Sequence, residues 1–341
     1  MIGYDPIMLD RVRYLTRHIG LASVLTPLMR GWHFVLSPRE PAPPQILIET
    51  YFRRHKRLLE QDWENVRAGY YPRELLFEFP LGEYAKLLPY GVVEFPSIWA
   101  RRARKRYDDL PEIENREFYP DYYLRTFHWQ SDGWMSDRSA RLYDLSVETL
   151  FVGTAAIMRR MAIPPLVDAL RQIDQPSILD VACGTGSFMA QLHRTLPRAK
   201  LTGIDLSPYY LRTAHDALNG VPGVSLVAEN AEQMPFGDAS FDAVASIFLF
   251  HELPRQARMN VLSEMYRVLR PGGRVVICDS AQPNDSPELE YFFRMFPLLY
   301  HEPYFKTYIA DLLETSLEEV GFTVSSSKPH FLSKVVVAEK D

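Results

Sequence analysis

A glycine-rich turn directly after an apolar run is the part of the sequence best suited to hold a ligand. Residues 178–181 have the composition of a buried strand, and Asp180 stands near its end. Residues 182–186 (ACGTG) follow, and their glycines permit a tight turn and close approach of the backbone to a bound molecule. A helix that begins at this turn would direct its N-terminus at the ligand. The pattern predicts a binding site that includes Asp180, Ala182, Gly184 and Gly186.

Polar residues also follow the next three predicted strands. Asp205 ends residues 200–205, and residues 229–236 (ENAEQMPF) and 248–252 (FLFHE) follow the third and fourth strands. The carboxyl ends of neighbouring parallel strands meet at one edge of a sheet, where ligands of open α/β folds bind. There, Asp205 can accept both hydroxyls of a ribose, and residues 229–236 can read an adenine edge. The ligand is therefore expected to contain a nucleoside.

A nicotinamide dinucleotide is the alternative ligand for a glycine-rich turn of this kind. However, Met189 stands where that motif has its third glycine, and Asp180 precedes the glycines. Each feature also has a purely structural reading, with Asp180 as a helix cap and Asp205 as a solvated strand end. Their occurrence at successive strand ends favours a site.

The elements that must position these residues alternate regularly after Pro164. Strands are predicted at residues 177–181, 200–205, 224–228, 241–247, 274–279, 322–327 and 334–338, and helices at about 186–196, 208–219, 255–269 and 304–320. This alternation predicts an α/β fold with a parallel sheet. The last two strands are separated by residues 328–333, too few for a helical crossover, so they should form an antiparallel hairpin.

With these motifs the sequence resembles the class I S-adenosylmethionine-dependent methyltransferases, nearest to the ubiquinone/menaquinone-biosynthesis type. The resemblance begins near residue 140 and rests on residues 139–144 (SARLYD), the glycine-rich turn, Asp205, 230–232 (NAE), 241–242 (FD) and 267–273 (RVLRPGG). It implies a Rossmann-like seven-stranded sheet, mostly parallel with an antiparallel last strand, flanked by helices. It also implies S-adenosylmethionine as the cofactor.

The resemblance assigns roles to individual residues. Gly184 and Gly186 would line the methionine part, Asp205 would bind the ribose, Ala231 and Glu232 would flank the adenine, and Phe248 would lie beside the cofactor. Tyr143, Leu206 and Asn230 complete the expected cofactor contacts, with Asp180 and Ala182. Two positions depart from the family pattern, because Ala182 replaces the usual first glycine and Asn230 replaces the common aspartate.

Methyl transfer from a sulfonium needs alignment of the reacting atoms, exclusion of water and, for some acceptors, removal of a proton. His251 follows the fourth strand and is the first candidate for the base, although it could instead only shape the pocket. No metal or covalent nucleophile is needed for this chemistry. No metal-ligand spacing is recognisable among the nine histidines, so no metal is expected.

The first part of the chain has a different composition. All five tryptophans and 11 of the 19 tyrosines precede residue 135. A helix pair is expected before the proline-rich residues 37–44, followed by a helix at about 44–68 and by irregular structure over 70–134. The predicted domains are a mainly helical, aromatic-rich N-terminal cap at 1–138 and a Rossmann-like domain at 139–341.

Residues 122–136 are expected to reach the ligand edge of the sheet. In one reading Trp129 and Trp134 wall an apolar substrate pocket, while His128, a second catalytic candidate, and Gln130 contact the acceptor or the cofactor carboxylate. In the other, the aromatic residues form the core of the smaller domain and His128 is a satisfied polar residue. Tyr300 and His301 are further substrate candidates, with a packing role as the alternative.

Composition limits the partners and the compartment. The 341 residues carry a formal charge of −5, which gives no electrostatic reason for a nucleic-acid partner. Neither a signal peptide nor a membrane anchor is recognised, and the two cysteines lie in strand-like stretches. A cytoplasmic protein with reduced thiols is expected; the oligomeric state is open, with a homodimer as one alternative.

The sequence thus predicts a methyltransferase for a small apolar or aromatic acceptor held between the two domains. The atom that receives the methyl group, whether oxygen, carbon or nitrogen, does not follow from it. The alternatives are a non-catalytic protein of the same fold that binds the cofactor or a partner, and a methyltransferase acting on protein. Residues 248–252 lack the Asn-Pro-Pro-Tyr type of sequence that nucleic-acid methylation would favour.

Overall fold

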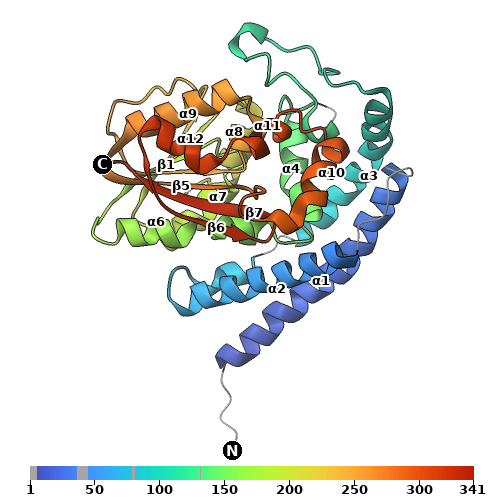
Figure 1. The fold of residues 1–341 in the computed structure, drawn as a ribbon, viewed down its shortest axis with the longest axis horizontal. Helices are drawn as coiled ribbons and strands as arrows, with labels where there is room; N and C mark the ends of the chain where they lie inside the picture. Colours follow the sequence, from blue (N-terminus) through green and yellow to red (C-terminus); the bar gives the residue numbers. More distant parts are fainter. Residues whose placement is uncertain (1–5, 37–44, 79–80, 131) are drawn as a thin grey trace, which may run out of the picture.

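The computed structural model describes residues 6–36, 45–78, 81–130 and 132–341. Its centre is one seven-stranded sheet in the order β3-β2-β1-β4-β5-β7-β6 (Figure 1). The strands are β1 (Ser177–Val181), β2 (Lys200–Asp205), β3 (Val224–Ala228), β4 (Phe241–Ile247), β5 (Leu269–Ser280), β6 (Thr323–His330) and β7 (Ser333–Glu339). β1 to β5 pair in parallel, and β7 lies antiparallel between β5 and β6. The predicted fold class is confirmed, hairpin included.

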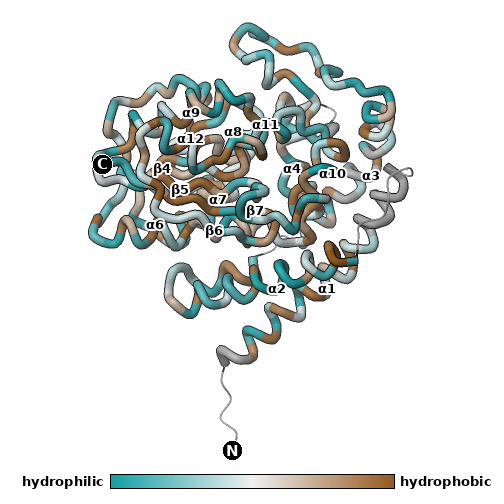
Figure 2. The backbone as a smooth tube through the Cα atoms, viewed as in Figure 1, coloured by the Kyte–Doolittle hydropathy of each residue, from teal (hydrophilic) through white to brown (hydrophobic). Residues whose placement is uncertain are grey.

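The central strands place successive residues on opposite faces of the sheet. Ile178 of β1 packs on one face with α6 (Ile163–Leu170) and α7 (Ser187–Thr195), and the neighbouring Leu179 packs on the other with α9 (Arg255–Val268) and α12 (Leu313–Val320). This follows from the two-residue period of a strand, which turns successive side chains to opposite faces. Figure 2 shows the apolar strands β4 and β5 enclosed between helices of mixed character. The ligand edge is thereby built on a rigid, doubly covered sheet.

The predicted helix over residues 304–320 is two helices instead, α11 (Phe305–Ala310) and α12. The buried amide of Gln282 explains the break. Its nitrogen donates to the carbonyl oxygens of Tyr308 and Asp311, and its oxygen accepts from the N–H of Leu313. These three bonds take the place of the backbone hydrogen bonds that a continuous helix would make at the junction. Sequence periodicity does not reveal them, because Gln282 belongs to another segment.

The N-terminal region also differs from its prediction. A single helix, α1 (Pro6–Leu36), replaces the expected helix pair, and the segment predicted to be irregular contains α3 (Leu81–Arg104). Pro27 and Pro89 lie inside these helices, although proline disfavours a helix interior. The predicted proline-rich break at 37–44 lies outside the described residues.

Helix α2 (Gln45–Arg67), predicted at about 44–68, docks this region onto the sheet-containing body (Figure 1). Asp62 is fully buried and accepts two hydrogen bonds from Arg160 of α5 (Ala155–Arg160), 3.0 and 2.6 Å long. Arg54 donates to the carbonyl oxygen of Phe331, next to β7. A buried ion pair of this kind is costly to break, so it fixes α2 in place.

Helix α4 (Asp137–Leu150) crosses the predicted domain boundary and leads toward the ligand edge; the remaining helices are α8 (Pro208–Ala217) and α10 (Glu290–Tyr300). Across the described ranges, no single helix is long and apolar enough to span a membrane. Only the pair formed by α4 and residues 155–170 reaches that length and apolarity, across a 91° bend.

Both cysteines are buried and unpaired, in line with the expected reduced thiols.

Candidate active site

The glycine-rich turn adopts the backbone that its sequence predicts. Ala182, Gly184 and Gly186 all have positive φ, at 58°, 54° and 78°. A Cβ at Gly184 would meet no atom within 4 Å, whereas one at Gly186 would lie 3.1 Å from the Cβ of Ala214. The first glycine therefore opens onto free space and the second allows α7 and α8 to pack closely.

Asp205 joins the first two loops of the ligand edge. Its Oδ2 accepts a 2.8 Å hydrogen bond from the N–H of Gly184, and its Oδ1 accepts one of 2.8 Å from the N–H of Ser207. Burial raises the pKa of Asp205 to about 6, although the two N–H groups oppose the shift. The carboxylate is thus held in one orientation at the end of β2.

Asp180 lies behind this carboxylate at the end of β1. It is 3% exposed, and its Oδ1 meets no hydrogen-bond partner among the described residues. Burial, and then the charge of Asp205, raise the pKa of Asp180 well above its usual range. An orphaned buried oxygen is costly and marks a place for a donor from a ligand.

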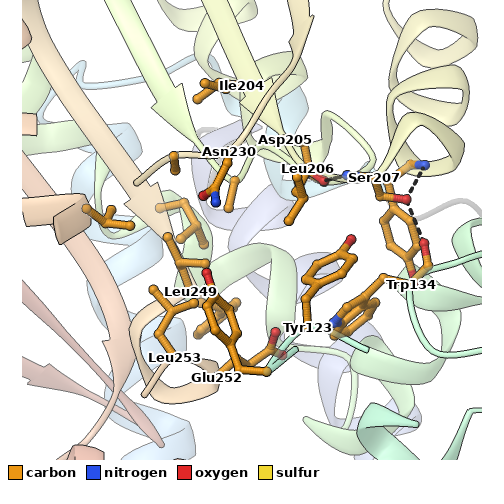
Figure 3. Close-up of a pocket in the computed structure, with 18 of the residues that line it drawn as sticks. Tyr123, Trp134, Ile204, Asp205, Leu206, Ser207, Asn230, Leu249, Glu252 and Leu253 are labelled. Atoms are coloured by element: carbon orange, nitrogen blue, oxygen red, sulfur yellow. Dashed lines mark hydrogen bonds between the residues drawn. The ribbon is translucent and has the colours of Figure 1, made fainter. Parts of the chain in front are cut away.

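A first cavity of about 750 Å³, its open mouth included, lies at the ends of β1, β2 and β4. Figure 3 shows Asp205, Leu206 and Asn230 along one side, Leu249 and Leu253 along a second, and Tyr123 and Trp134 along a third. Eight predicted cofactor residues line the cavity: Tyr143, Ala182, Gly184, Asp205, Leu206, Asn230, Ala231 and Phe248.

The other three predicted cofactor residues do not line this cavity. Asp180 and Gly186 have the roles described above. The carboxylate of Glu232 instead accepts hydrogen bonds from the hydroxyl of Tyr122, at 2.6 Å, and from the side-chain amide of Asn260, at 2.8 Å. Glu232 therefore positions Tyr122, which lines the cavity.

The segment before α4 covers the first cavity. Trp134 packs edge-to-face against Tyr143 and Tyr210, and its carbonyl oxygen accepts a 2.6 Å hydrogen bond from the hydroxyl of Ser207 (Figure 3). Trp134 was predicted to wall the substrate pocket, and the structure places it at the cavity of the predicted cofactor residues. Tyr122 and Tyr123, which were not singled out, belong to the same aromatic stretch.

Asp144 fixes the turn from the side of α4. Its Oδ2 accepts hydrogen bonds of 2.6 and 2.8 Å from the hydroxyls of Thr185 and Ser187, and its Oδ1 accepts one of 3.1 Å from Arg159. Asp144 therefore ties the glycine-rich turn to the helix that precedes the sheet.

A second cavity adjoins the first, with an empty volume of about 450 Å³. Tyr143, Phe248 and Glu252 line both cavities. The other walls of the second cavity are mostly apolar and come from distant segments: Val147, Leu150, Phe151, Phe292, Phe296 and Leu332, with His128, His251 and Ser280 as polar groups. The two predicted catalytic residues thus meet at this cavity although 123 positions separate them.

His251 is held by Asp279 of β5. Its Nδ1 lies 2.6 Å from Oδ1 of Asp279, which leaves Nε2 toward Glu252, 3.8 Å from Oε1. Burial alone would lower the pKa of His251, but the charge and hydrogen bond of Asp279 outweigh it and raise the pKa to about 9. The ring therefore has a fixed orientation beside the second cavity.

His128 lies between two carboxylates, and its backbone has a positive φ of 53° in the short helix η3 (Phe127–Trp129). Its Nε2 is 3.3 Å from Oε1 of Glu252, and its Nδ1 is 3.0 Å from Oε1 of Glu302. Burial would lower the pKa of His128, but the charges of Glu302 and Glu252 raise it to about 10. Neither carboxylate was singled out from the sequence, although each directly follows a histidine that was.

The remaining predicted substrate residues line neither cavity. Gln130 accepts a hydrogen bond from the hydroxyl of Ser139, Tyr300 packs against Phe296, and His301 stacks on Tyr107 with ring centroids 4.4 Å apart. Trp129 belongs to η3, but its side chain lies outside the described part of the structure. Their substrate roles stay predictions.

The sheet order, with a glycine-rich turn after β1 and an acidic residue ending β2, is the architecture of the class I methyltransferases. Residues 178–273 match the family model described as a methyltransferase domain. The ubiquinone/menaquinone biosynthesis C-methyltransferase of Desulfotalea psychrophila is 34% identical over 48% of this chain and 66% of its own length. The demethylmenaquinone methyltransferase of Chlorobaculum tepidum is 32% identical over 54% of this chain and 76% of its own length.

The chain belongs to the class I S-adenosylmethionine-dependent methyltransferases of the ubiquinone/menaquinone-biosynthesis type. The alignment spans 46% of the length of the demethylmenaquinone methyltransferase of Listeria welshimeri, which is 37% identical. Among solved structures, human N-acetylserotonin methyltransferase in complex with SAM aligns with a TM-score of 0.49 and 14% identity, over 72% of this chain and 66% of that one. The family model and the curated relatives confirm the predicted family and its cofactor.

Proposed function

We propose that this protein transfers a methyl group from S-adenosylmethionine to a small aromatic acceptor bound in the second cavity. The observation that carries the proposal is the pair of adjoining cavities with three shared walls, Tyr143, Phe248 and Glu252. A donor in one cavity and an acceptor in the other would meet at these walls, and such proximity is the main requirement of methyl transfer.

The residues of the first cavity fit the proposed donor. Asp205 presents a fixed carboxylate for the ribose hydroxyls, and Gly184 leaves open space where a backbone must approach a ligand. Asn230 and Ala231 line the side where the adenine would lie. When bound, S-adenosylmethionine supplies the methyl group on a positively charged sulfur.

The second cavity fits an aromatic ring with a polar substituent. Phe151 and Phe248 stack at 5.9 Å between ring centroids, and Phe292 and Phe296 add further aromatic wall. His251 and Glu252 supply the polar end, next to the first cavity. The apolar walls exclude water, while His251, oriented by Asp279, holds the polar group of the acceptor. The role of His251 as a base stays a prediction.

A ring of the quinol type is the acceptor class we infer. The support comes from the cavity walls and from relatives named for demethylmenaquinone methylation and for ubiquinone/menaquinone biosynthesis. A reduced quinone carries the hydroxyl that the polar end requires. We assign the aromatic segment at residues 122–134 as the cap that closes over both substrates.

The test begins with calorimetric titration of the purified protein with S-adenosylmethionine and with its demethylated product. Turnover is then measured with naphthoquinols and simple phenols, and mass spectrometry of the products separates carbon from oxygen methylation. We expect cofactor binding and transfer to a quinol. Binding without transfer to any acceptor would instead support a cofactor-binding protein without catalysis.

A further inference from the structure

Three side chains with metal-ligating atoms converge at the edge of the second cavity. His128 comes from η3, Glu252 from the short helix η4 (Phe250–Glu252), and Glu302 from the turn between α10 and α11. One ligand atom from each of them lies within 4.8 Å of the other two. Residues far apart in the sequence therefore form a compact cluster of one imidazole and two carboxylates.

The carboxylate of Glu302 is buried without a hydrogen-bond donor of good geometry. The residue is 2% exposed, and within the described ranges neither carboxylate oxygen meets a donor in hydrogen-bonding geometry. Nδ1 of His128 approaches Oε1 to 3.0 Å but outside that geometry. A buried carboxylate without donors is costly unless a cation pairs with it or a metal binds it. Oε2 of Glu302, which no described group approaches as a donor, thus offers a place for a further ligand.

We infer that His128, Glu252 and Glu302 form a binding site for a divalent first-row transition ion. Imidazole together with carboxylates suits ions such as Zn²⁺ and Mn²⁺ better than Mg²⁺ or Ca²⁺, which favour oxygen ligands alone. His128 would bind the ion through one ring nitrogen only, because its two nitrogens face different carboxylates, Nε2 at 3.3 Å from Glu252 and Nδ1 at 3.0 Å from Glu302.

The position of the cluster suggests what the ion would bind. His128 and Glu252 line the second cavity, so coordination positions not taken by protein face the acceptor. An ion there would hold an oxygen of the acceptor and polarise it. This role rests on the proposed methyl transfer, whereas metal binding itself does not.

The test uses the full-length protein, stripped with a chelator and free of cofactor and acceptor. It is titrated calorimetrically with ZnCl₂ and with MnCl₂, and the bound metal is counted by elemental analysis. We expect one ion per chain, and affinity lower by at least about tenfold in Glu302→Gln and in His128→Asn. His301→Asn is the matched control, because it alters a histidine beside Glu302 that is not a proposed ligand, and its affinity should equal that of the parent.

Absence of saturable binding, or binding that Glu302→Gln and His128→Asn leave unchanged, would overturn the site. The cluster would then be an imidazolium held between two carboxylates. Thermal unfolding of each variant without metal checks that it is folded. If Glu302→Gln does not fold, the metal affinity of Glu252→Gln tests the site instead. Glu252 lies at the cavity surface, so this change should disturb the fold less. Metal binding without methyl transfer would refute the proposed function alone.

Discussion

The two cavities are built from the chain in different ways. The first is made largely by the loops that follow β1, β2, β3 and β4, so its residues lie close to strand ends that the sequence displays. The second draws its walls from α4, η3, η4, α10 and the turn before β7. Cofactor recognition is thus encoded locally, whereas acceptor recognition depends on long-range packing. Mutations should therefore separate the two functions.

The largest effect is expected from Asp205→Ala, which should weaken cofactor binding by at least about 100-fold. The change removes two charge-assisted contacts to the ligand, each worth about 1.5–3 kcal/mol, and also frees the N–H groups of Gly184 and Ser207. Calorimetry measures the loss. Asp216→Ala on the exposed side of α8 is the control, and an affinity of Asp205→Ala within threefold of the parent would contradict the assignment.

Asp279→Asn should impair the acceptor cavity alone and leave cofactor binding unchanged. It replaces the acceptor that orients His251, and misplacement of a positioned group costs on the order of 100-fold in rate. We expect kcat to fall by about that factor at saturating cofactor, with the cofactor Kd unchanged within twofold. Equal losses in kcat and cofactor affinity would show that the two cavities do not act separately.

Cofactor affinity should depend on pH through Asp205. Its pKa in the free protein is raised to about 6, and only the ionised carboxylate can accept both ribose hydroxyls. Affinity should therefore be constant above about pH 7 and fall by about tenfold per pH unit below 6, a change of about 1.4 kcal/mol per unit. Titrations at pH 5, 6, 7 and 8 measure this. A profile that stays flat down to pH 5 would exclude the ionised Asp205 as the ribose ligand.

The smallest effect is expected from Phe151→Leu. It removes one ring of the stacked pair with Phe248, an interaction of about 0.5–1.5 kcal/mol. The KM for the acceptor should rise about 3- to 10-fold while kcat and cofactor affinity stay unchanged. Phe118→Leu, at an exposed position, should change nothing. An effect of Phe151→Leu on cofactor affinity alone would reassign this wall to the first cavity.

The same contrast explains what the sequence could predict. β1 to β4 were predicted to the residue, because each is a short apolar run bounded by turn residues. Asp205 and Gly184 could be identified because the edge of a parallel sheet gathers strand ends. The α11–α12 break depends on Gln282, a residue of another segment, and no local pattern contains it.

The residues around the second cavity show why tertiary contacts could not be predicted from the sequence. His128 and His251 were singled out by residue type, yet their partners Glu302 and Asp279 come from other elements and are identified only by tertiary contact. The segment that contains α3 was predicted to be irregular, but it is helical in the structure despite Pro89 in its interior. Gln130, Tyr300 and His301 line neither cavity, and their substrate roles stay predictions.

The three side chains common to both cavities, Tyr143, Phe248 and Glu252, make the two ligands thermodynamically dependent on each other. Whatever fills the first cavity rests against the walls of the second and restricts their motion. Any factor by which the cofactor strengthens acceptor binding must, by reciprocity, equal the factor by which the acceptor strengthens cofactor binding. Titration of an acceptor with and without the demethylated cofactor already bound measures this factor and its sign.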